Sequence, residues 1–219
     1  MPIPPLPGTI QKAQAGLAGF DINQVLTGAQ ARGLKGAGYD FCLRYIPHQG
    51  SKPQGLLTRT EAMDILNAGL ALSAVQRANS PGWLPSAALG TQDGNDAIDY
   101  AQNTLGLPAG MILWCDLEVV DEHAGSDVVL AYGQAWYTAV KAAGYIPGLY
   151  VGADINLTDQ QLYNDLSFQH YWKAYNGQDV ATRGFQIIQH TDIIVNHLTI
   201  GPDHTYVDAM GDSALWLSL

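Results

Sequence analysis

The chain has 219 residues, of which 47% are hydrophobic and 14% are charged, so it can fold around one sizeable core and does not have the composition of a disordered chain. Acidic residues outnumber basic residues by 20 to 10, and the net charge of −10 argues against a nucleic-acid partner, which needs a basic face. No apolar run approaches the length of a membrane span.

The first residues, MPIPPLPGTIQKAQAG, are rich in proline and lack the continuous apolar stretch of a secretory signal. We expect residues 1–17 to form a Pro-rich arm or linker and residues 18–219 to form one domain. If its substrate lies outside the cytoplasm, the protein would then have to be released by phage lysis, by a secretion system or as part of a longer chain.

One pattern recurs along the chain: a helical stretch ends in a glycine, and a short apolar run follows at once. It occurs at 35–46, 66–76, 105–119 and 141–152. Glycine supplies the left-handed conformation that ends a helix, and short apolar runs of this kind are typical of buried parallel strands. Strands that alternate with helices indicate βαβ units. Helix starts are marked as well, for example by Thr58 and Glu61 in the spacing of a capping box.

Eight strands are expected in all, at 18–23, 40–46, 71–76, 111–119, 146–152, 170–176, 185–191 and 205–210. Eight is the number that closes a barrel. The connections 177–184 and 192–204 are too short or too rich in Gly and Pro for full helices. The sequence therefore predicts a single, irregular TIM-like (β/α)8 barrel of the α/β class, with helices reduced or missing after strands six and seven.

Four carboxylates fall near the ends of these strands, where barrels of this kind carry their active sites. Asp21 closes the first strand, Asp116 and Glu118 lie at the end of the fourth, and Asp208 lies on the eighth. We expect them to converge on one mouth of the barrel. Taken alone, Asp21 and Asp208 are explained equally well as solvated strand ends.

Asp116 and Glu118 form the most informative pair. Residues two apart on a strand point to the same face, so both carboxyl groups should face inward, about 6–7 Å apart along the strand. Like charges at that separation raise the pKa of one member, which leaves one acid and one carboxylate near neutral pH. A glycosidase needs such a pair. The pair interrupts the apolar run MILWCDLEVV, where charges without a purpose are costly, so we favour function over a solvated strand end.

Aromatic and amide side chains accompany the carboxylates near the strand ends, and rings and amides are the groups that bind sugars. The predicted substrate-binding residues are Tyr45, Gln76, Tyr150, Trp172, Tyr175 and Gln189, with Tyr206 nearby. Any one of these rings is explained at least as well by core packing. Trp83, in the loop after strand three, is a candidate lid or rim platform.

Other chemistries have little support in the sequence. The six histidines show no metal-ligand spacing, and there is no nucleophile elbow, P-loop or dinucleotide turn, so we predict no metal and no cofactor. A metal site assembled in three dimensions from loop histidines stays a weaker alternative. Cys42 and Cys115 lie in apolar runs and are expected to be buried free thiols, although a bridge between neighbouring strands stays open.

The motifs on the first, fourth and eighth expected strands resemble those of known families in their order and spacing. The GFD of the first strand, the D-x-E of the fourth and an inward Asp on the eighth resemble glycoside hydrolase family 25, the Chalaropsis-type lysozymes. The segments GFDINQ (19–24), FCLRYI (41–46), LLTRTEAMDILNAGLALSAVQ (56–76) and Tyr-Val-Asp (206–208) resemble more closely the glycoside-hydrolase-like family called domain of unknown function 1906, over about residues 18–210.

The resemblance implies a muramidase-like enzyme that cleaves the β-1,4 bond between N-acetylmuramic acid and N-acetylglucosamine in peptidoglycan. It implies that Glu118 is the general acid and that Asp116 orients the 2-acetamido group or acts more directly on the anomeric carbon. Asp21 and Asp208 would hold the hydrogen-bond network around them. The expected partner is peptidoglycan or a related amino-sugar glycan, and the expected protein is a monomer that acts outside the cytoplasm, on the cell wall.

Two other functions stay open. The barrel could be a glycan-binding or structural module without turnover, which a blocked mouth or an acid pair bound to Arg44 would favour. It could also be a metal-dependent hydrolase or phosphodiesterase, which a divalent metal held between the carboxylates and His190 or His204 would favour.

Overall fold

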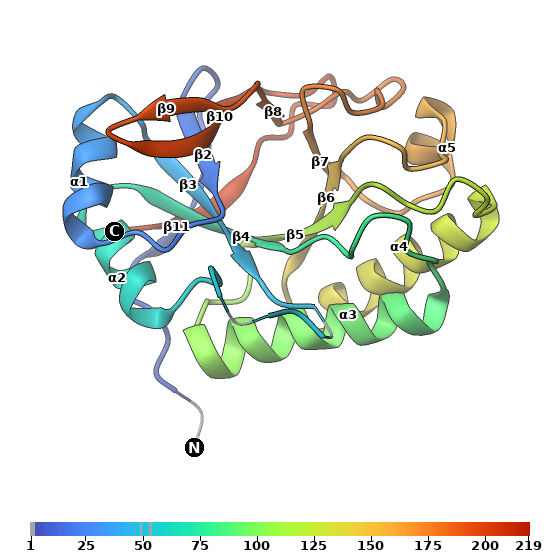
Figure 1. Ribbon diagram of the computed structural model, residues 1–219, viewed down its shortest axis with the longest axis horizontal. Coiled ribbons are helices and arrows are strands. Elements are labelled where there is room, and N and C mark those ends of the chain that lie inside the picture. Colours follow the sequence, from blue (N-terminus) through green and yellow to red (C-terminus); the bar gives the residue numbers. More distant parts are fainter. Residues whose placement is uncertain (1–2, 49, 53) are drawn as a thin grey trace.

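The computed structural model describes residues 3–48, 50–52 and 54–219. Eight strands close into a barrel, in the order β2-β3-β4-β5-β6-β7-β8-β10 (Figure 1). Their bounds are β2 Ala18–Ile22, β3 Phe41–Ile46, β4 Ala71–Gln76, β5 Ile112–Leu117, β6 Ile146–Val151, β7 His170–Lys173, β8 Ile187–Gln189 and β10 Leu198–Thr205. The strands from β2 to β8 run parallel. The predicted α/β barrel is therefore confirmed.

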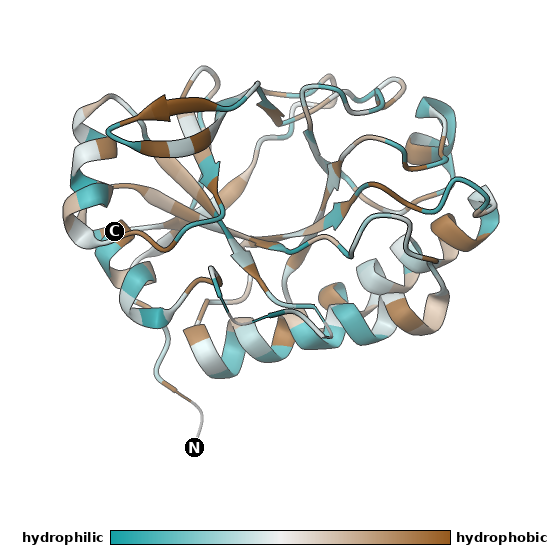
Figure 2. Ribbon diagram, viewed as in Figure 1, coloured by the Kyte–Doolittle hydropathy of each residue, from teal (hydrophilic) through white to brown (hydrophobic). Residues whose placement is uncertain are grey.

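Helices follow the first five barrel strands and cover the outside of the barrel. They are α1 Gly28–Gly36, α2 Arg59–Asn67, α3 Ala87–Asp99, α4 Ser126–Ala142 and α5 Asp159–Asn164, and a π-helical turn, η1 Tyr100–Leu105, continues α3. Helices α3 and α4 lie side by side (Figure 1), and both alternate between polar and apolar segments (Figure 2). The described residues between β7 and β10 contain no helix, which confirms the predicted loss of helices in the last third. None of the described helices is long and apolar enough to cross a membrane.

The eighth strand differs from the expectation. It runs over Leu198–Thr205 instead of 205–210, and it is antiparallel to both of its neighbours, β2 and β8. The chain reverses at Asn196 and His197, which have φ of 50° and 65°, between β9 (Ile193–Val195) and β10. The connection that the sequence showed as a loop is thus a β-hairpin. Its direction places the end of β10 at the opposite end of the barrel from the ends of β2 to β8.

The N-terminal segment is partly built into the fold. Within the stretch 1–17, which the sequence predicts to be an arm or linker, β1 (Thr9–Lys12) pairs with β11 (Leu215–Ser218). Leu6 is buried, and its amide donates to the carbonyl of Gly106. β11 also pairs with β4, and its Trp216 stacks on Phe41 of the barrel interior, so these two short strands are joined to the barrel.

The core has two parts, and they leave only the strand ends free for chemistry. Inside the barrel lie large apolar side chains, including Phe41, Leu43, Trp114, Trp172 and Ile187. The outward residues of the same strands pack against the helices. Strand β5 shows the alternation, because Ile112 and Trp114 point inward whereas Leu113, Cys115 and Leu117 point outward. Asp116 continues the inward set, and the apolar interior lies directly beneath it.

Candidate active site

Three of the four predicted carboxylates meet at the mouth of the barrel. Asp21 is near the end of β2, Asp116 lies in β5, and Glu118 follows β5 directly. Asp21 and Asp116 are 7% and 4% exposed, and Glu118 is half-buried. The charge of Asp21 raises the pKa of both Asp116 and Glu118, and the charge of Glu118 raises the pKa of Asp116. We call these three residues the acid cluster.

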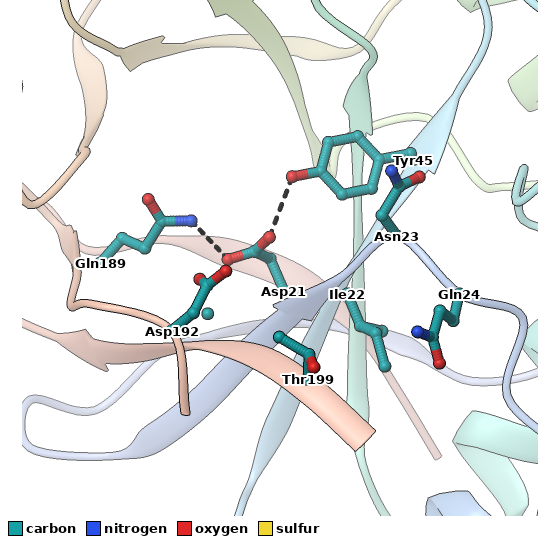
Figure 3. Close-up of a pocket in the computed structure, with 9 residues that line it drawn as sticks. Asp21, Ile22, Asn23, Gln24, Tyr45, Gln189, Asp192 and Thr199 are labelled. Carbon is teal, nitrogen blue, oxygen red and sulfur yellow. Dashed lines mark hydrogen bonds between the residues drawn. The ribbon is translucent and has the colours of Figure 1, made fainter. Parts of the chain in front are cut away.

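Asp21 lies in a pocket of about 400 Å³ whose polar lining comes from β2, β3, β8 and the β9–β10 hairpin (Figure 3). Tyr45 donates its hydroxyl to one carboxylate oxygen of Asp21 at 2.9 Å, and the Gln189 amide donates to the other. Tyr150 in turn donates to the Gln189 carbonyl at 2.9 Å. Space for the carboxylate depends on Gly201 of β10, since a Cβ there would lie 2.2 Å from an Asp21 oxygen.

Burial raises the pKa of every member of the acid cluster. It raises the pKa of Asp21 to about 6, although the hydrogen bonds from Gln189 and Tyr45 oppose the rise. Burial, and then the nearby charges of Glu118 and Asp21, hold the pKa of Asp116 well above its usual range. One oxygen of Asp116 has no hydrogen-bond partner among the described residues. The pKa of Glu118 is raised by burial and by Asp21. The cluster therefore retains a proton well above the pH at which a free carboxyl group ionises.

Asp203 is a fourth inward carboxylate that the sequence analysis did not find. It is fully buried on β10, and the Trp172 indole donates to it at 2.8 Å. Burial and the charge of Asp21 raise the pKa of Asp203 well above its usual range. The pair Gly201-Pro202 directly before it indicated a loop, which concealed the strand. A signal was present in the β-branched residues Thr199 and Ile200, which a strand assignment over 198–205 would have used.

Asp208 does not join the acid cluster. It follows β10, and because β10 is antiparallel, Asp208 lies at the opposite end of the barrel from Asp21. There it pairs with Arg183 at 2.7 Å, and it accepts from the Gln186 amide and from the backbone amide of Asp212. The expectation that Asp208 shares a mouth with the other carboxylates is wrong, because it assumed a parallel eighth strand. These bonds connect the loop after β10 to the segment before β8.

The predicted substrate-binding residues divide into two groups. Tyr45, Tyr150 and Gln189 surround Asp21, and Trp172 is buried beneath them, in edge-to-face contact with Tyr150. Tyr175 follows β7 and is 62% exposed.

Gln76 does not lie at the barrel mouth, as the sequence analysis expected. Its side chain points outward, where it accepts from the Trp136 indole and donates to the Tyr132 hydroxyl. Gln76 therefore joins the barrel to α4.

Two neighbouring loops hold the backbone around Glu118 in place. The Trp83 indole donates to the Glu118 carbonyl at 2.9 Å, and the Gly82 amide donates to the Val119 carbonyl at 2.8 Å. From the other side, the amide of Val119 donates to Ala153 at 2.9 Å. Val119 has φ of 46°, an uncommon conformation for a β-branched residue. Trp83, a candidate lid from the sequence, is thus a support for the Glu118 backbone.

Gly152, at the end of β6, leaves the space that the Glu118 side chain occupies. A Cβ on Gly152 would lie 2.3 Å from the Glu118 Cβ and 3.1 Å from the Leu117 carbonyl oxygen. We expect Gly152→Ala to displace Glu118 and to lower kcat about 100-fold, because misplacing a reacting group by about 1 Å costs that much. Steady-state kinetics on the substrate proposed below measures the effect. Gly36→Ala, which adds a Cβ in open space, is the control and should keep full activity.

The raised pKa of Asp21 predicts how its removal changes stability with pH. The folded pKa is about 6 and the ordinary value is 3.8, so between these values the folded state holds a proton that the unfolded state has lost. Stability then falls as pH rises through this window. We expect Asp21→Asn to be more stable than the wild type at pH 7, by about 1–3 kcal/mol, and to lose that advantage at pH 3.5. Denaturant unfolding at both pH values measures the difference. A gain of equal size at both would contradict the assignment.

Two alternatives depended on residues near the acid cluster: Arg44 for a binding module, and His190 or His204 for a metal-dependent hydrolase. Arg44 is buried on the outer side of β3 and pairs with Glu61 of α2 at 2.7 Å, away from the acid cluster. His190 and His204 pack edge-to-face against each other, with ring centroids 5.1 Å apart. Among the described residues, no three His, Cys, Asp or Glu side chains are grouped to hold a metal. Cys42 and Cys115 are buried free thiols.

The family comparison matches most of the chain. A model described as the Rv2525c-like, glycoside hydrolase-like domain matches residues 32–204, which include three of the four inward carboxylates. No curated protein matches the chain in sequence.

Solved structures share the fold at low sequence identity. An uncharacterised protein from B. stearothermophilus has a TM-score of 0.68 at 20% identity, over 87% of this chain and 96% of that chain. The Tat-secreted protein Rv2525c of Mycobacterium tuberculosis has a TM-score of 0.66 at 15% identity, over 87% and 95%. A family 25 glycosyl hydrolase from Bacillus anthracis has a TM-score of 0.61 at 13% identity, over 88% and 89%. At these identities the likeness establishes the fold alone.

Proposed function

Since the chain belongs to the family of Rv2525c-like, glycoside hydrolase-like domains, we propose that it is a glycoside hydrolase that cleaves the β-1,4 glycan bond of peptidoglycan in the manner of a muramidase. The observation that carries the proposal is the acid cluster: Asp21, Asp116 and Glu118 meet at the barrel mouth with raised pKa values. None of them takes part in an ion pair between described residues. Three mutually repelling buried acids cost stability, and a catalytic role explains why they are kept.

Glu118 is the general acid in this proposal. It is the least buried member of the acid cluster and so the first to meet a bound glycan, and its raised pKa favours the protonated form that a proton donor needs. Glu118 protonates the glycosidic oxygen as the bond to the anomeric carbon breaks, and a water molecule then adds to the anomeric carbon and gives its proton to the Glu118 carboxylate.

Asp116 acts beside the anomeric carbon. Its unpartnered oxygen is free to accept from the N–H of the 2-acetamido group or to stabilise the positive charge that develops on the sugar. Burial raises the pKa of Asp116 by disfavouring its charged form. A positive charge developing on the sugar would stabilise that charged form, because opposite charges attract strongly where water is excluded. Asp21 keeps the ring hydroxyl of Tyr45 and the amide of Gln189 in fixed orientations, and with Asp203 it tunes the protonation of the pair.

The mouth supplies groups that suit a sugar. Tyr45, Tyr150 and Gln189 offer rings and an amide around Asp21, and Tyr175 offers an exposed ring after β7. The structural relatives include the Tat-secreted Rv2525c, an endolysin and muramidases, which supports action on the cell wall outside the cytoplasm. We expect the protein to act as a monomer.

The test is muropeptide release from purified peptidoglycan, with the new chain ends identified by mass spectrometry. The proposal expects products with N-acetylmuramic acid at the new reducing end. New reducing ends of N-acetylglucosamine would change the assigned bond. If no product forms while the protein still binds the glycan, the barrel is a non-catalytic binding module and the proposal fails.

A further inference from the structure

A second pocket adjoins the acid cluster and has the opposite charge. It has a volume of about 500 Å³ and is lined by Asn23, Lys52, Gln54, Gly55 and Arg77. Asn23 also lines the pocket around Asp21, so the two pockets are neighbours that share this residue. We call Lys52 and Arg77 the cationic pair.

Arg77 is held in place by its hydrogen bonds. The Arg77 guanidinium donates to the backbone carbonyls of Lys52 and Gln54, at 3.5 and 3.3 Å, and to the side-chain oxygen of Asn23. These bonds hold the segment that carries Lys52 against Arg77. They also connect Arg77 to the residue that both pockets share. Lys52 and Arg77 line one pocket, so two positive charges face the same space.

Neither cation has a carboxylate partner within the described residues. The ion pairs found there use Lys35, Arg44, Lys173, Arg183 and His123. Arg and Lys are the side chains that bind carboxylates most strongly. Both charges at this pocket are therefore available to an anion on a ligand.

The position of the cationic pair relates it to the proposed reaction. Arg77 directly follows β4, and Asp21 lies on β2, with β3 between them. The side-chain oxygen of Asn23, two residues after Asp21, accepts from Arg77, so the anion would bind beside the strand end that carries Asp21. A charged substituent on a glycan whose scissile bond lies at the acid cluster would reach that position. Neutral N-acetylglucosamine polymers carry no such group, whereas peptidoglycan carries carboxylates on its stem peptides, and on its lactyl groups where the stem peptide has been removed.

We propose that Lys52 and Arg77 form a subsite for a carboxylate carried by the glycan, and that this subsite selects carboxylate-bearing amino-sugar glycans over neutral ones. This inference rests on the proposed function for the identity of the glycan. Its test measures binding, so it remains decisive even if turnover is absent.

The experiment measures binding by calorimetry in a Glu118→Gln background, with three probes. They are a neutral N-acetylglucosamine oligosaccharide, a glycan strand with lactyl groups but no peptides, and a muropeptide with its stem peptide. Lys52→Gln is the main variant, because Lys52 is exposed and its side chain makes no described hydrogen bond, so the fold is kept. Arg77→Lys is the second variant, since it keeps the charge and loses the planar fork. Lys141→Gln, on the far side at the end of α4, is the control.

We expect Lys52→Gln to weaken binding of a carboxylate-bearing probe about 5-fold, in line with a partly exposed charge pair, and to leave the neutral probe and the control unchanged. A loss with the lactyl strand assigns the lactyl carboxylate, and a loss only with the muropeptide assigns the stem peptide. Equal affinities for all three probes, or an equal loss with the neutral oligosaccharide, would overturn the inference.

Discussion

Glu118→Gln should lower kcat for peptidoglycan cleavage about 10²–10⁴-fold, the range for removing a general acid, and leave the fold unchanged. Gln keeps the size of the side chain and removes only the transferable proton. The Glu118 side chain accepts no described hydrogen bond, and it is its backbone carbonyl that Trp83 holds. The loss should therefore appear in activity and not in stability. Muropeptide release measures the first, and thermal unfolding followed by circular dichroism measures the second.

The leaving group separates a lost proton donor from a disturbed site. An aryl glycoside with an acidic phenol as leaving group needs little protonation, so its cleavage should fall far less in Glu118→Gln than cleavage of the natural glycan. Glu122→Gln is the matched control, because Glu122 lies in the same loop and its side chain is 87% exposed. Its activity should equal that of the wild type. Unchanged activity in Glu118→Gln would refute the mechanism, and an equal loss on both substrates would reassign Glu118 to a positioning role.

The sequence predicted the parallel part of the barrel because its signals are local. In two of the repeats the helix ends at a glycine with positive φ, Gly69 at 83° and Gly144 at 87°, and the strand begins two residues later. Because glycine is strongly favoured in this backbone conformation, the glycine itself marks the helix end in the sequence. The acid pair was predictable for a similar reason, since Asp116 and Glu118 share a face whatever the direction of their strand.

Positions that depend on strand parity or direction were not predictable. Gln76 lies in ALSAVQ, where all residues are buried on both faces, so no alternation of polar and apolar residues shows which side each one faces. Asp208 was predicted as the inward carboxylate of the last barrel strand, a position that Asp203 occupies, because the sequence does not show that this strand is antiparallel. That direction depends on the hairpin turn at Asn196 and His197, residues that adopt positive φ without a glycine signal. β1 was missed because its partner, β11, lies at the far end of the sequence.

Arg44→Met should destabilise the protein by about 3–5 kcal/mol, the cost of leaving one partner of a buried ion pair alone. Arg44 has no exposed surface, and its guanidinium bonds both oxygens of Glu61, at 2.7 and 3.2 Å. It also donates to the carbonyls of Ile22 and Gly55. Glu61 further accepts from the Leu26 amide, so the pair connects α2, β3 and the segment after β2. Denaturant unfolding measures the loss.

The double variant Arg44→Met, Glu61→Leu should recover part of that stability, because it leaves no buried carboxylate without its cation, while the backbone groups of Ile22, Gly55 and Leu26 still lose these bonds. Lys35→Met is the control: its pair with Asp40 has the same chemistry but is 38–39% exposed, so the loss should stay under about 1 kcal/mol. The acid cluster lies inside the barrel, on the other face of the sheet from Arg44, so the double variant should retain activity at a temperature where it is folded. If activity were lost from a folded double variant, Arg44 would act on Asp21 through the carbonyl of Ile22, and the two faces of the sheet would not be independent.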